Sequence, residues 1–332
     1  MTIKDVSREA GVSIKTVSRV LNNEKYVGAE TRARVAAVVE RLNFRPSSAA
    51  RVLAGRRSFQ IALICDNPSP YYVYEMQTGI RDRCEEQGVR MIAQPYDRQS
   101  SKLLDEIESL IDSIQIDGLI LTPPASDCIE VLDLLSARGV PFVRVSPGTE
   151  VMLTSSTFID NAAAAADVTQ HLIDLGHRRI AHIGGDPAFA ASAQRTAGYL
   201  NAMRASGIAV DPALIRTGNF YFTSGASEAE ALLALPSPPT AIFAASDDMA
   251  AGALAAAHRL GVRVPEALSI AGFDDTAISR VVWPPLTTIR QPMREMAYAA
   301  ADLLLRPTGA AVERRELGYE LVVRGSTAAA TR

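Results

Sequence analysis

Hydrophobic positions in the first 46 residues recur with the three- and four-residue spacing of amphipathic helices. They form three groups: Ile3, Val6 and Ala10; Val17, Val20 and Leu21; and Val35, Val38, Val39 and Leu42. Each group would line one face of a helix and leave the other face polar. We therefore expect three short helices that share one small core.

Residues that start and stop helices flank these groups. Thr2 and Asp5 have the spacing of a capping box, and Gly11 can adopt the positive φ that ends a helix. Ser13 can cap the second helix, which leaves only about three residues between the first two helices. Pro46 lies beyond the third group and stops its helix. This order of elements predicts a helix-turn-helix unit.

A different pattern begins at Ser58, where short apolar runs alternate with longer helical stretches. The runs are FQIALIC, VRMIAQPY, DGLILTP, PFVRVS, RRIAHIG, TAIFAAS and LSIAGF. Their spacing is typical of βαβ units, and it suggests about ten strands in two sets. The predicted fold class is α/β, with a three-helix helix-turn-helix head and a body of two Rossmann-like subdomains separated by a cleft.

Charge is unevenly distributed along the chain, which has 332 residues and a formal net charge of −3. Residues 1–60 contain twelve Lys and Arg against five Asp and Glu, whereas the remainder contains 22 basic and 32 acidic residues. A basic head on an acidic body favours a polyanionic partner such as double-stranded DNA. A solvated basic arm would have the same charge, so charge alone does not distinguish it from a DNA-binding head. The order of the predicted helices does.

The chain lacks the marks of export and of disulfide chemistry. There is no run of about 18 apolar residues, and the beginning MTIKDVSREAG has no apolar stretch before a cleavage site. Cys65, Cys84 and Cys128 are odd in number and form no C-x-x-C pair, which disfavours a disulfide framework and a cysteine metal site. We expect no membrane span and a cytoplasmic, nucleoid-associated protein.

The outward face of the second helix has the chemistry of a DNA-reading surface. Lys15 and Arg19 can donate hydrogen bonds to guanine, and Ile14 can pack on a thymine methyl group, so we expect these three to contact bases. Polar side chains around them are suited to phosphate contacts: Thr2, Ser13, Thr16, Ser18, Asn22, Tyr26 and Thr31. The alternative is a three-helix unit that binds a protein.

Residues 47–57 link the two regions. Ser47 or Ser48 could cap a short helix that ends at Gly55, but so short a helix would form only with a partner. In that helix Leu53 could wedge between base pairs in the minor groove, accompanied by Ala50, Arg51 and Ala54. Composition alone favours the alternative, an ordinary linker.

Three stretches of the head form a distinctive set: TIKDVSREAGVSIKTVSRVLN, YVGAETRARV and SSAARVLAG. In these stretches the head resembles the DNA-binding head of the LacI/GalR family of bacterial transcription regulators. The resemblance implies a repressor that binds a palindromic operator as a homodimer, with bases read by Ile14, Lys15 and Arg19. It also implies paired hinge helices that insert Leu53 at the centre of the palindrome.

Polar and aromatic residues follow many of the apolar runs of the body. Ligands of doubly wound folds bind outside the carboxyl ends of the strands, where planar polar groups hold vicinal hydroxyls and aromatic rings pack on sugars. The side chains expected to bind such an effector are Tyr71, Tyr72, Asp160, Arg195, Phe220, Ser246, Asp274 and Gln291. For any single Asp after a strand, helix capping alone is an open alternative.

The body resembles the effector domain of the same family in LGHRRIAHIGG, SDDMAAGAL, LSIAGFDD and PPLTTIRQP. The resemblance implies a periplasmic-binding-protein-like fold and places Asp160, Arg195, Phe220, Asp274 and Gln291 at effector-contact positions. Tyr71 and Tyr72 fall near the first-strand ligand loop, whereas Ser246 replaces an asparagine often found there. We prefer a small sugar as the effector and carbohydrate-utilisation genes as the target. The family also includes purine-responsive and partner-protein-responsive members, so a regulator of either kind is the alternative.

Other function classes fit the sequence less well. No G-x-G-x-x-G follows the first strand, and no G-x-x-x-x-G-K-[ST] or G-x-S-x-G occurs, so we expect neither an enzyme nor a cofactor. His171, His177 and His182 form no H-E-x-x-H pattern, so we expect no metal and place them at the surface or at helix ends. A sugar-binding protein without a regulatory role would share the body but not the basic head.

The expected division of the chain follows from these patterns. It comprises a head (1–46), a hinge (47–57) and an effector-binding and dimerisation domain (58–332), the last made of subdomain N (58–160 and 292–322) and subdomain C (161–291 and 323–332). The C-terminal RGSTAAATR has no leucine heptad for a tetramerising coiled coil. A ligand in the cleft would alter DNA affinity only by its differential affinity for two body conformations.

Overall fold

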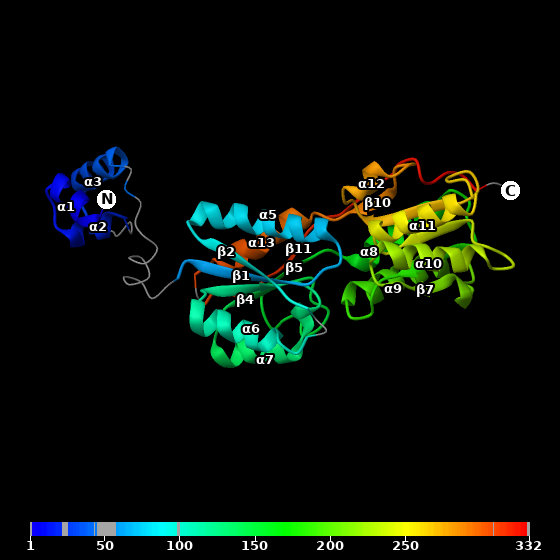
Figure 1. Ribbon diagram of the computed structural model, residues 1–332, viewed down its shortest axis with the longest axis horizontal. Coiled ribbons are helices and arrows are strands. Elements are labelled where there is room, and N and C mark those ends of the chain that lie inside the picture. Colours follow the sequence, from blue (N-terminus) through cyan, green and yellow to red (C-terminus); the bar gives the residue numbers. More distant parts are fainter. Residues whose placement is uncertain are drawn as a thin grey trace. The chain divides into compact units, whose positions relative to one another are not determined.

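The computed structural model describes residues 2–21, 26–42, 44, 58–97, 100–307 and 309–330. The chain divides into two compact units, with the boundary between Phe59 and Gln60. The first unit contains the helix-turn-helix head, and the second contains both sheets of the body (Figure 1). The predicted α/β class with an N-terminal helix-turn-helix head is confirmed.

The head consists of helices α1 (Ile3–Ala10), α2 (Ile14–Leu21) and α3 (Ala29–Arg41). The capping box at Thr2 and Asp5 is present, and Gly11 ends α1 with a φ of 62°. Ser13 begins α2, because its hydroxyl accepts a hydrogen bond from the Thr16 amide at 3.1 Å. Residues from all three helices, together with Phe44, form the core: Val6, Ala10, Val17, Val35, Val38 and Phe44. The three predicted helices are confirmed. Phe44 also belongs to the core, although it is in none of the predicted hydrophobic groups.

Subdomain N contains a six-stranded parallel sheet with the order β11-β5-β4-β3-β1-β2. Its strands are β1 (Gln60–Cys65), β2 (Arg90–Pro95), β3 (Gly118–Leu121), β4 (Phe142–Val145), β5 (Ser156–Phe158) and β11 (Arg314–Glu316). Its helices are α5 (Pro70–Gln87), α6 (Leu103–Ser109), α7 (Ile129–Arg138) and α13 (Met293–Leu304), with a short π-helix η1 (Leu110–Ile114) after α6 and a 3₁₀ helix η2 (Ala125–Asp127). Helices α5 and α13 cover one face, and α6 and α7 cover the other (Figure 1).

Subdomain C contains a second six-stranded sheet with the order β12-β10-β9-β8-β6-β7. Its strands are β6 (Ile180–Gly184), β7 (Ile215–Thr217), β8 (Ala241–Ala244), β9 (Ser269–Asp274), β10 (Thr287–Arg290) and the antiparallel edge strand β12 (Glu320–Val322). Its helices are α8 (Asn161–Asp174), α9 (Ala190–Ala205), α10 (Phe222–Leu233), α11 (Asp247–Arg259) and α12 (Ile278–Val281), with the turn η3 (Pro212–Leu214). Helices α8 and α9 pack on one face, and α10 and α11 on the other.

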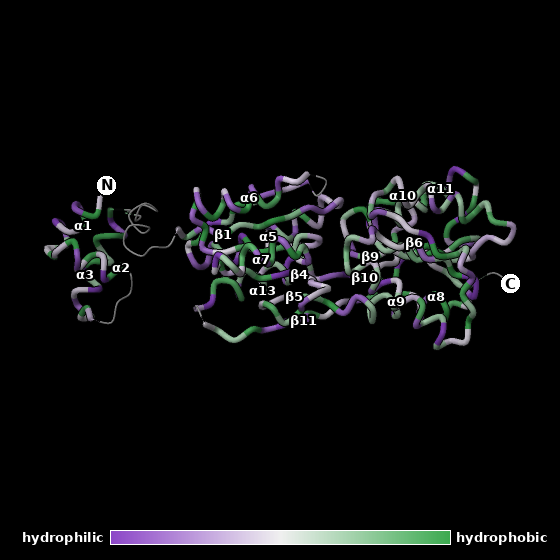
Figure 2. Tube along the Cα trace, turned by 90° about the horizontal axis from the view of Figure 1, so that it is seen from below, coloured by the Kyte–Doolittle hydropathy of each residue, from purple (hydrophilic) through white to green (hydrophobic). Residues whose placement is uncertain are grey.

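Hydrophobic stretches follow the inner strands of both sheets, and hydrophilic stretches gather in the outer loops (Figure 2). Central strands such as β3 and β8 are buried along their whole length, because helices cover both faces of each sheet. This explains why the sequence shows continuous apolar runs rather than an alternating pattern. Among the described residues, no helix is both long and apolar enough to cross a membrane.

The chain crosses between the subdomains three times within the body. In the described part of the body, the first two crossovers lie between β5 and α8 and between β10 and α13. The third lies before Glu320, rather than after residue 322, because β12 pairs with β10 of subdomain C. Subdomain N therefore ends a few residues earlier than expected.

Helices α5 and α13 pack so closely that one position requires glycine. A Cβ atom at Gly79 would lie 2.1 Å from the carbonyl oxygen of Arg294 and 2.8 Å from the Cβ of Ala297. We predict that Gly79→Ala lowers the free energy of unfolding by about 1–3 kcal/mol, because one helix must move away from the other. Thermal unfolding of the full chain measures this change. Gly318→Ala is the control, since no atom lies within 4 Å of its added Cβ; equal stability of both variants would contradict the prediction.

Candidate functional site

The amino-terminal half of α2 forms the outer surface of the head. Ile14 and Lys15 are exposed, and Val17, which follows within one turn, is fully buried in the head core. Arg19 is half-buried on the same helix. The face with the expected base-reading residues therefore lies opposite the face that packs on α1 and α3. This is the orientation that lets a helix enter the major groove.

The residues expected to contact phosphates lie around this helix. Thr2, Ser13 and Tyr26 are exposed, whereas Thr16, Ser18 and Thr31 are half-buried: Thr2 caps α1, Ser13 caps α2 and Thr31 lies in the first turn of α3. The Ser13 and Thr16 hydroxyls are 2.9 Å apart and bond to each other. Asn22 and the expected minor-groove residues Ala50, Arg51, Leu53 and Ala54 lie outside the described residues. The DNA contacts of all these residues stay predictions.

A cavity within the body lies where the carboxyl ends of strands from both sheets meet. It comprises about 550 Å³ of space not filled by protein atoms, including its mouth. Its lining residues come from both subdomains: Asn67, Ser69, Tyr72, Pro123, Ser146, Asn161, Phe189, Ala191, Arg195, Phe220, Ser246, Asp274 and Gln291. Six of the eight expected effector-binding residues belong to this set: Tyr72, Arg195, Phe220, Ser246, Asp274 and Gln291.

Arg195 on α9 is held in the cavity wall by contacts on several sides. Its Nε donates to Oδ1 of Asn161 at 3.0 Å, and its Nη1 donates to the Ala245 carbonyl at 2.6 Å. The guanidinium lies over the Phe273 ring, 3.6 Å from the ring centroid, and Nη1 is 3.6 Å from Oδ1 of Asp274. These contacts leave the guanidinium little rotational freedom, so its remaining donors have a set direction.

Asp274 completes an ion pair that is buried in the cavity. Its Oδ1 accepts a hydrogen bond from Nε2 of Gln291, which lies on the second crossover. Burial raises the pKa of Asp274 to about 6, although Arg195 and Gln291 oppose that change. Burial likewise lowers the pKa of Arg195, against the pull of Asp274. Among the described residues, the cavity lining thus carries one cation and one anion, and these compensate each other.

Aromatic side chains form another wall. The rings of Phe189 and Phe220 meet edge to face, with centroids 5.3 Å apart. Phe220 has a φ of 69°, and its ring lies directly on the backbone of Gly185, where a Cβ would come within 2.1 Å of it. Burial raises the pKa of Tyr72, so this phenol stays protonated. The cavity therefore combines flat apolar faces with hydroxyl and amide groups.

Two of the expected residues lie elsewhere. Tyr71 is 41% exposed and lines a neighbouring hollow with Arg280 and Arg290. Asp160 caps α8, since its Oδ1 accepts from the Ala163 amide at 2.8 Å, and it lines a third hollow. Ser246 has both of the roles considered for residues after strands, because its side chain lines the cavity and also caps α11.

Sequence reasoning left seven lining residues outside the expected set: Asn67, Ser69, Pro123, Ser146, Asn161, Phe189 and Ala191. Asn67, Ser69 and Asn161 follow apolar runs, so their position after a strand is a signal that could have found them. Phe189 and Ala191 have no such signal, because they lie at the beginning of α9 rather than directly after a strand.

The histidines serve structural roles. His177 is buried between the hydroxyls of Thr240 and Ser269, and His182 is fully buried, with its ring stacked on Tyr199 and Phe243. His171 lies in the last turn of α8, so the expected helix-end place is confirmed for it. The expected surface place is wrong for His177 and His182, because both rings are buried and satisfy polar groups of the second sheet. Burial lowers the pKa of His182 to about 4. Among the described residues, no group of three or more His, Cys, Asp or Glu is placed to hold a metal ion.

Comparison with known families gives two matches. Residues 2–47 match the model of bacterial regulatory proteins of the lacI family. Residues 169–327 match the model of a periplasmic binding protein-like domain. The first match covers the helix-turn-helix head, and the second covers most of subdomain C.

Whole-chain relatives agree with these matches. The chain is 34% identical over 306 residues to the ribose operon repressor of Haemophilus influenzae, covering 92% of this chain and 91% of that protein. It superposes on the lac repressor dimer bound to operator and the anti-inducer ONPF with a TM-score of 0.83 and 29% identity, covering 99% of each chain. A complex of the transcriptional regulator CelR with cellobiose gives a TM-score of 0.76 and 30% identity, covering 98% of this chain and 99% of that chain. The chain belongs to the LacI family of bacterial regulatory proteins, and it is a transcriptional regulator rather than an enzyme.

Proposed function

We propose that this regulator is a repressor of carbohydrate-utilisation genes that binds a palindromic operator as a homodimer. A neutral sugar or sugar derivative in the cavity of the body would control its affinity for DNA. One observation carries the proposal: a helix-turn-helix head shares its chain with a cavity in which the charged side chains of the described lining, Arg195 and Asp274, compensate each other. The protein would act in the cytoplasm, at the nucleoid, where its operator lies.

The chemistry of the cavity favours a neutral ligand with several hydroxyl groups. A phosphorylated ligand needs cations that are not already neutralised, and Arg195 is paired with Asp274. Carboxylate, guanidinium and amide groups together can hold vicinal hydroxyls, and the Phe220 ring can pack on the apolar face of a sugar. The similarity to a ribose operon repressor and to a cellobiose complex supports this class. A purine could also stack on Phe220, and is the second candidate.

Control of DNA binding would follow from linkage. A single head supplies one half-site, so recognition of a palindrome requires two chains related by two-fold symmetry. A ligand that binds one arrangement of the subdomains more tightly shifts the equilibrium by that difference in affinity, typically about 1–3 kcal/mol. An inducer would favour the arrangement with weak operator binding, and a corepressor the arrangement with strong binding.

The first prediction concerns base reading by α2. Lys15→Ala should weaken operator binding by about 1–3 kcal/mol and relax the preference at one base pair of each half-site, because one base contact is lost. The operator is first selected from genomic fragments by the full chain, and affinities are then measured by fluorescence anisotropy on single-base variants. Lys4→Ala on α1 is the control, which should leave the base preference unchanged. An equal loss on every sequence would make Lys15 a phosphate contact.

The second prediction concerns the ligand. In a thermal-shift panel of ribose, cellobiose, other neutral sugars and purines, we expect a neutral sugar to raise the unfolding temperature, because a cavity ligand stabilises the folded state. Asp274→Ala should abolish the shift and spare operator binding without ligand. Tyr71→Ala should retain the shift, since Tyr71 does not line the cavity. A shift with purines alone would favour the second candidate, and no shift at all would contradict ligand control.

The third prediction concerns pH. Asp274 has a pKa raised to about 6, so its carboxylate is protonated below that pH and loses the charge that strengthens hydrogen bonds from ligand hydroxyls. Ligand affinity measured by calorimetry should therefore fall several-fold between pH 7.5 and pH 5. In Asp274→Asn the affinity should be lower and nearly independent of pH over this range. A flat profile for the unmodified chain would show that Asp274 does not bind the ligand as a carboxylate.

A further inference from the structure

The turn that follows β9 has a strained backbone. Asp274 has a φ of 115° and Asp275 a φ of 52°, so two consecutive residues other than glycine occupy the positive-φ region. Such conformations are unfavourable for residues other than glycine and persist only where surrounding contacts impose them. Because Asp274 is the acidic residue of the cavity, the contacts that impose this turn bear on ligand binding.

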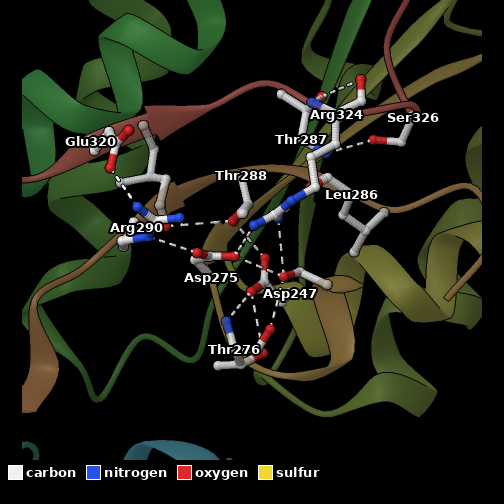
Figure 3. Close-up of polar contacts among 12 residues, drawn as sticks. Asp247, Asp275, Thr276, Leu286, Thr287, Thr288, Arg290, Glu320, Arg324 and Ser326 are labelled. Carbon is white, nitrogen blue, oxygen red and sulfur yellow. Dashed lines mark hydrogen bonds and ion pairs between the residues drawn. The ribbon is translucent and has the colours of Figure 1, made fainter. Parts of the chain in front are cut away.

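Asp275 provides the first anchor of the turn (Figure 3). Its side chain is 2% exposed. Its carboxylate accepts hydrogen bonds from Nε of Arg290 at 2.7 Å, from Nη2 of Arg324 at 2.5 Å and from Oγ of Ser279 at 2.9 Å. Burial works to raise the pKa of Asp275, but these donors hold it below its ordinary value. The residue next to Asp274 is therefore fixed by two guanidinium groups from different segments.

Asp247 provides the second anchor (Figure 3). This residue opens α11 and is fully buried. Its Oδ2 accepts from the amide and the hydroxyl of Thr276, at 2.7 and 3.2 Å, and its Oδ1 accepts from the hydroxyl of Thr288 at 2.6 Å. Burial raises the pKa of Asp247, and the same three donors oppose that change. The turn is thus fastened at both residues that follow Asp274.

The two arginine partners of Asp275 belong to segments next to crossovers between the subdomains. Arg290 is the last residue of β10, and its Nη1 also donates to Glu320, the first residue of β12, at 2.5 Å. Arg290 and Glu320 are register partners in the antiparallel pair. Arg324 donates to the Leu286 carbonyl at 2.8 Å as well, so it ties the C-terminal segment to the strand that carries Arg290. Neither anchor residue, Asp275 or Asp247, lines the cavity.

We infer that Asp275, with its partners Arg290 and Arg324, and Asp247 are positioning residues that hold Asp274 in its strained conformation, with its carboxylate in the cavity. They do not touch the ligand. Their effect on ligand binding rests on the proposed function, in which Asp274 contacts the ligand. The position of the Asp274 carboxylate itself can be measured without any ligand.

The test is a carboxyl-carbon NMR titration of the full chain labelled with ¹³C-aspartate, without ligand or DNA. The signal that disappears in Asp274→Asn identifies Asp274. The ionisable groups that act on this carboxyl are Arg195, Asp247, Asp248 and Tyr72, and we expect it to titrate near pH 6 because it is buried.

Arg290→Met should lower the midpoint by about one pH unit or more, because the released carboxyl moves towards water. Arg290 is half-exposed, so this variant tests the anchor without emptying the core. Glu320→Gln is the matched control: it removes the second partner of Arg290, leaves Asp275 paired, and should not move the midpoint. In Arg290→Lys the midpoint should return most of the way to that of the unmodified chain, because a cation again pairs with Asp275.

A loss of stability alone would not move this titration, so a merely structural role would leave the midpoint near 6 in Arg290→Met. Arg324→Met provides an independent variant on the other guanidinium. An unchanged midpoint in both folded variants would overturn the inference, as would a midpoint near the ordinary 3.8 in the unmodified chain. If the Asp274 midpoint falls in these variants as expected, but no compound of the thermal-shift panel raises the unfolding temperature, the proposed function is overturned and the positioning role stands.

Discussion

The buried ion pair of Arg195 and Asp274 is the interaction on which the cavity depends. It joins α9 to the end of β9, and both partners are almost fully shielded from water. Removing one partner of such a pair leaves an uncompensated buried charge, which costs about 3–5 kcal/mol. Neighbouring groups supply hydrogen-bond partners to both buried charges. Asn161 and the Ala245 carbonyl accept hydrogen bonds from Arg195, and Gln291 donates one to Asp274.

Compensation of charge also determines what the cavity can hold. With its cation and anion already paired, the lining favours groups that share hydrogen bonds rather than groups that bring net charge. The two parallel sheets explain why polar groups gather here, because the carboxyl ends of strands from both subdomains meet at this place. The strained turn at Asp274 and Asp275 lies at the same edge, next to two of the three crossovers.

The structure of the head, unlike that of the cavity, depends almost entirely on local sequence signals. Capping at Thr2 and Ser13 and the left-handed conformation of Gly11 set the limits of α1 and α2. Hydrophobic spacing then places Val6 and Val17 in one core. Nothing in this small unit requires contacts between residues far apart in the chain, apart from the packing of α3, which is why periodicity and caps were sufficient to predict it.

The sequence by itself determined the helices of the head, the parallel sheets of the body and the edge where polar residues gather, because periodicity, caps and continuous apolar runs are local properties. Only the tertiary structure decided which of two neighbouring residues faces the cavity. Asn161 lines it, whereas Asp160 caps α8; Tyr72 lines it, whereas Tyr71 does not. Successive residues of a helix point about 100° apart, so one position changes which surface a side chain reaches. The anchors of Asp274 come from α11, β10 and the segment after β12, and such long-range pairing leaves no periodic signal in the sequence.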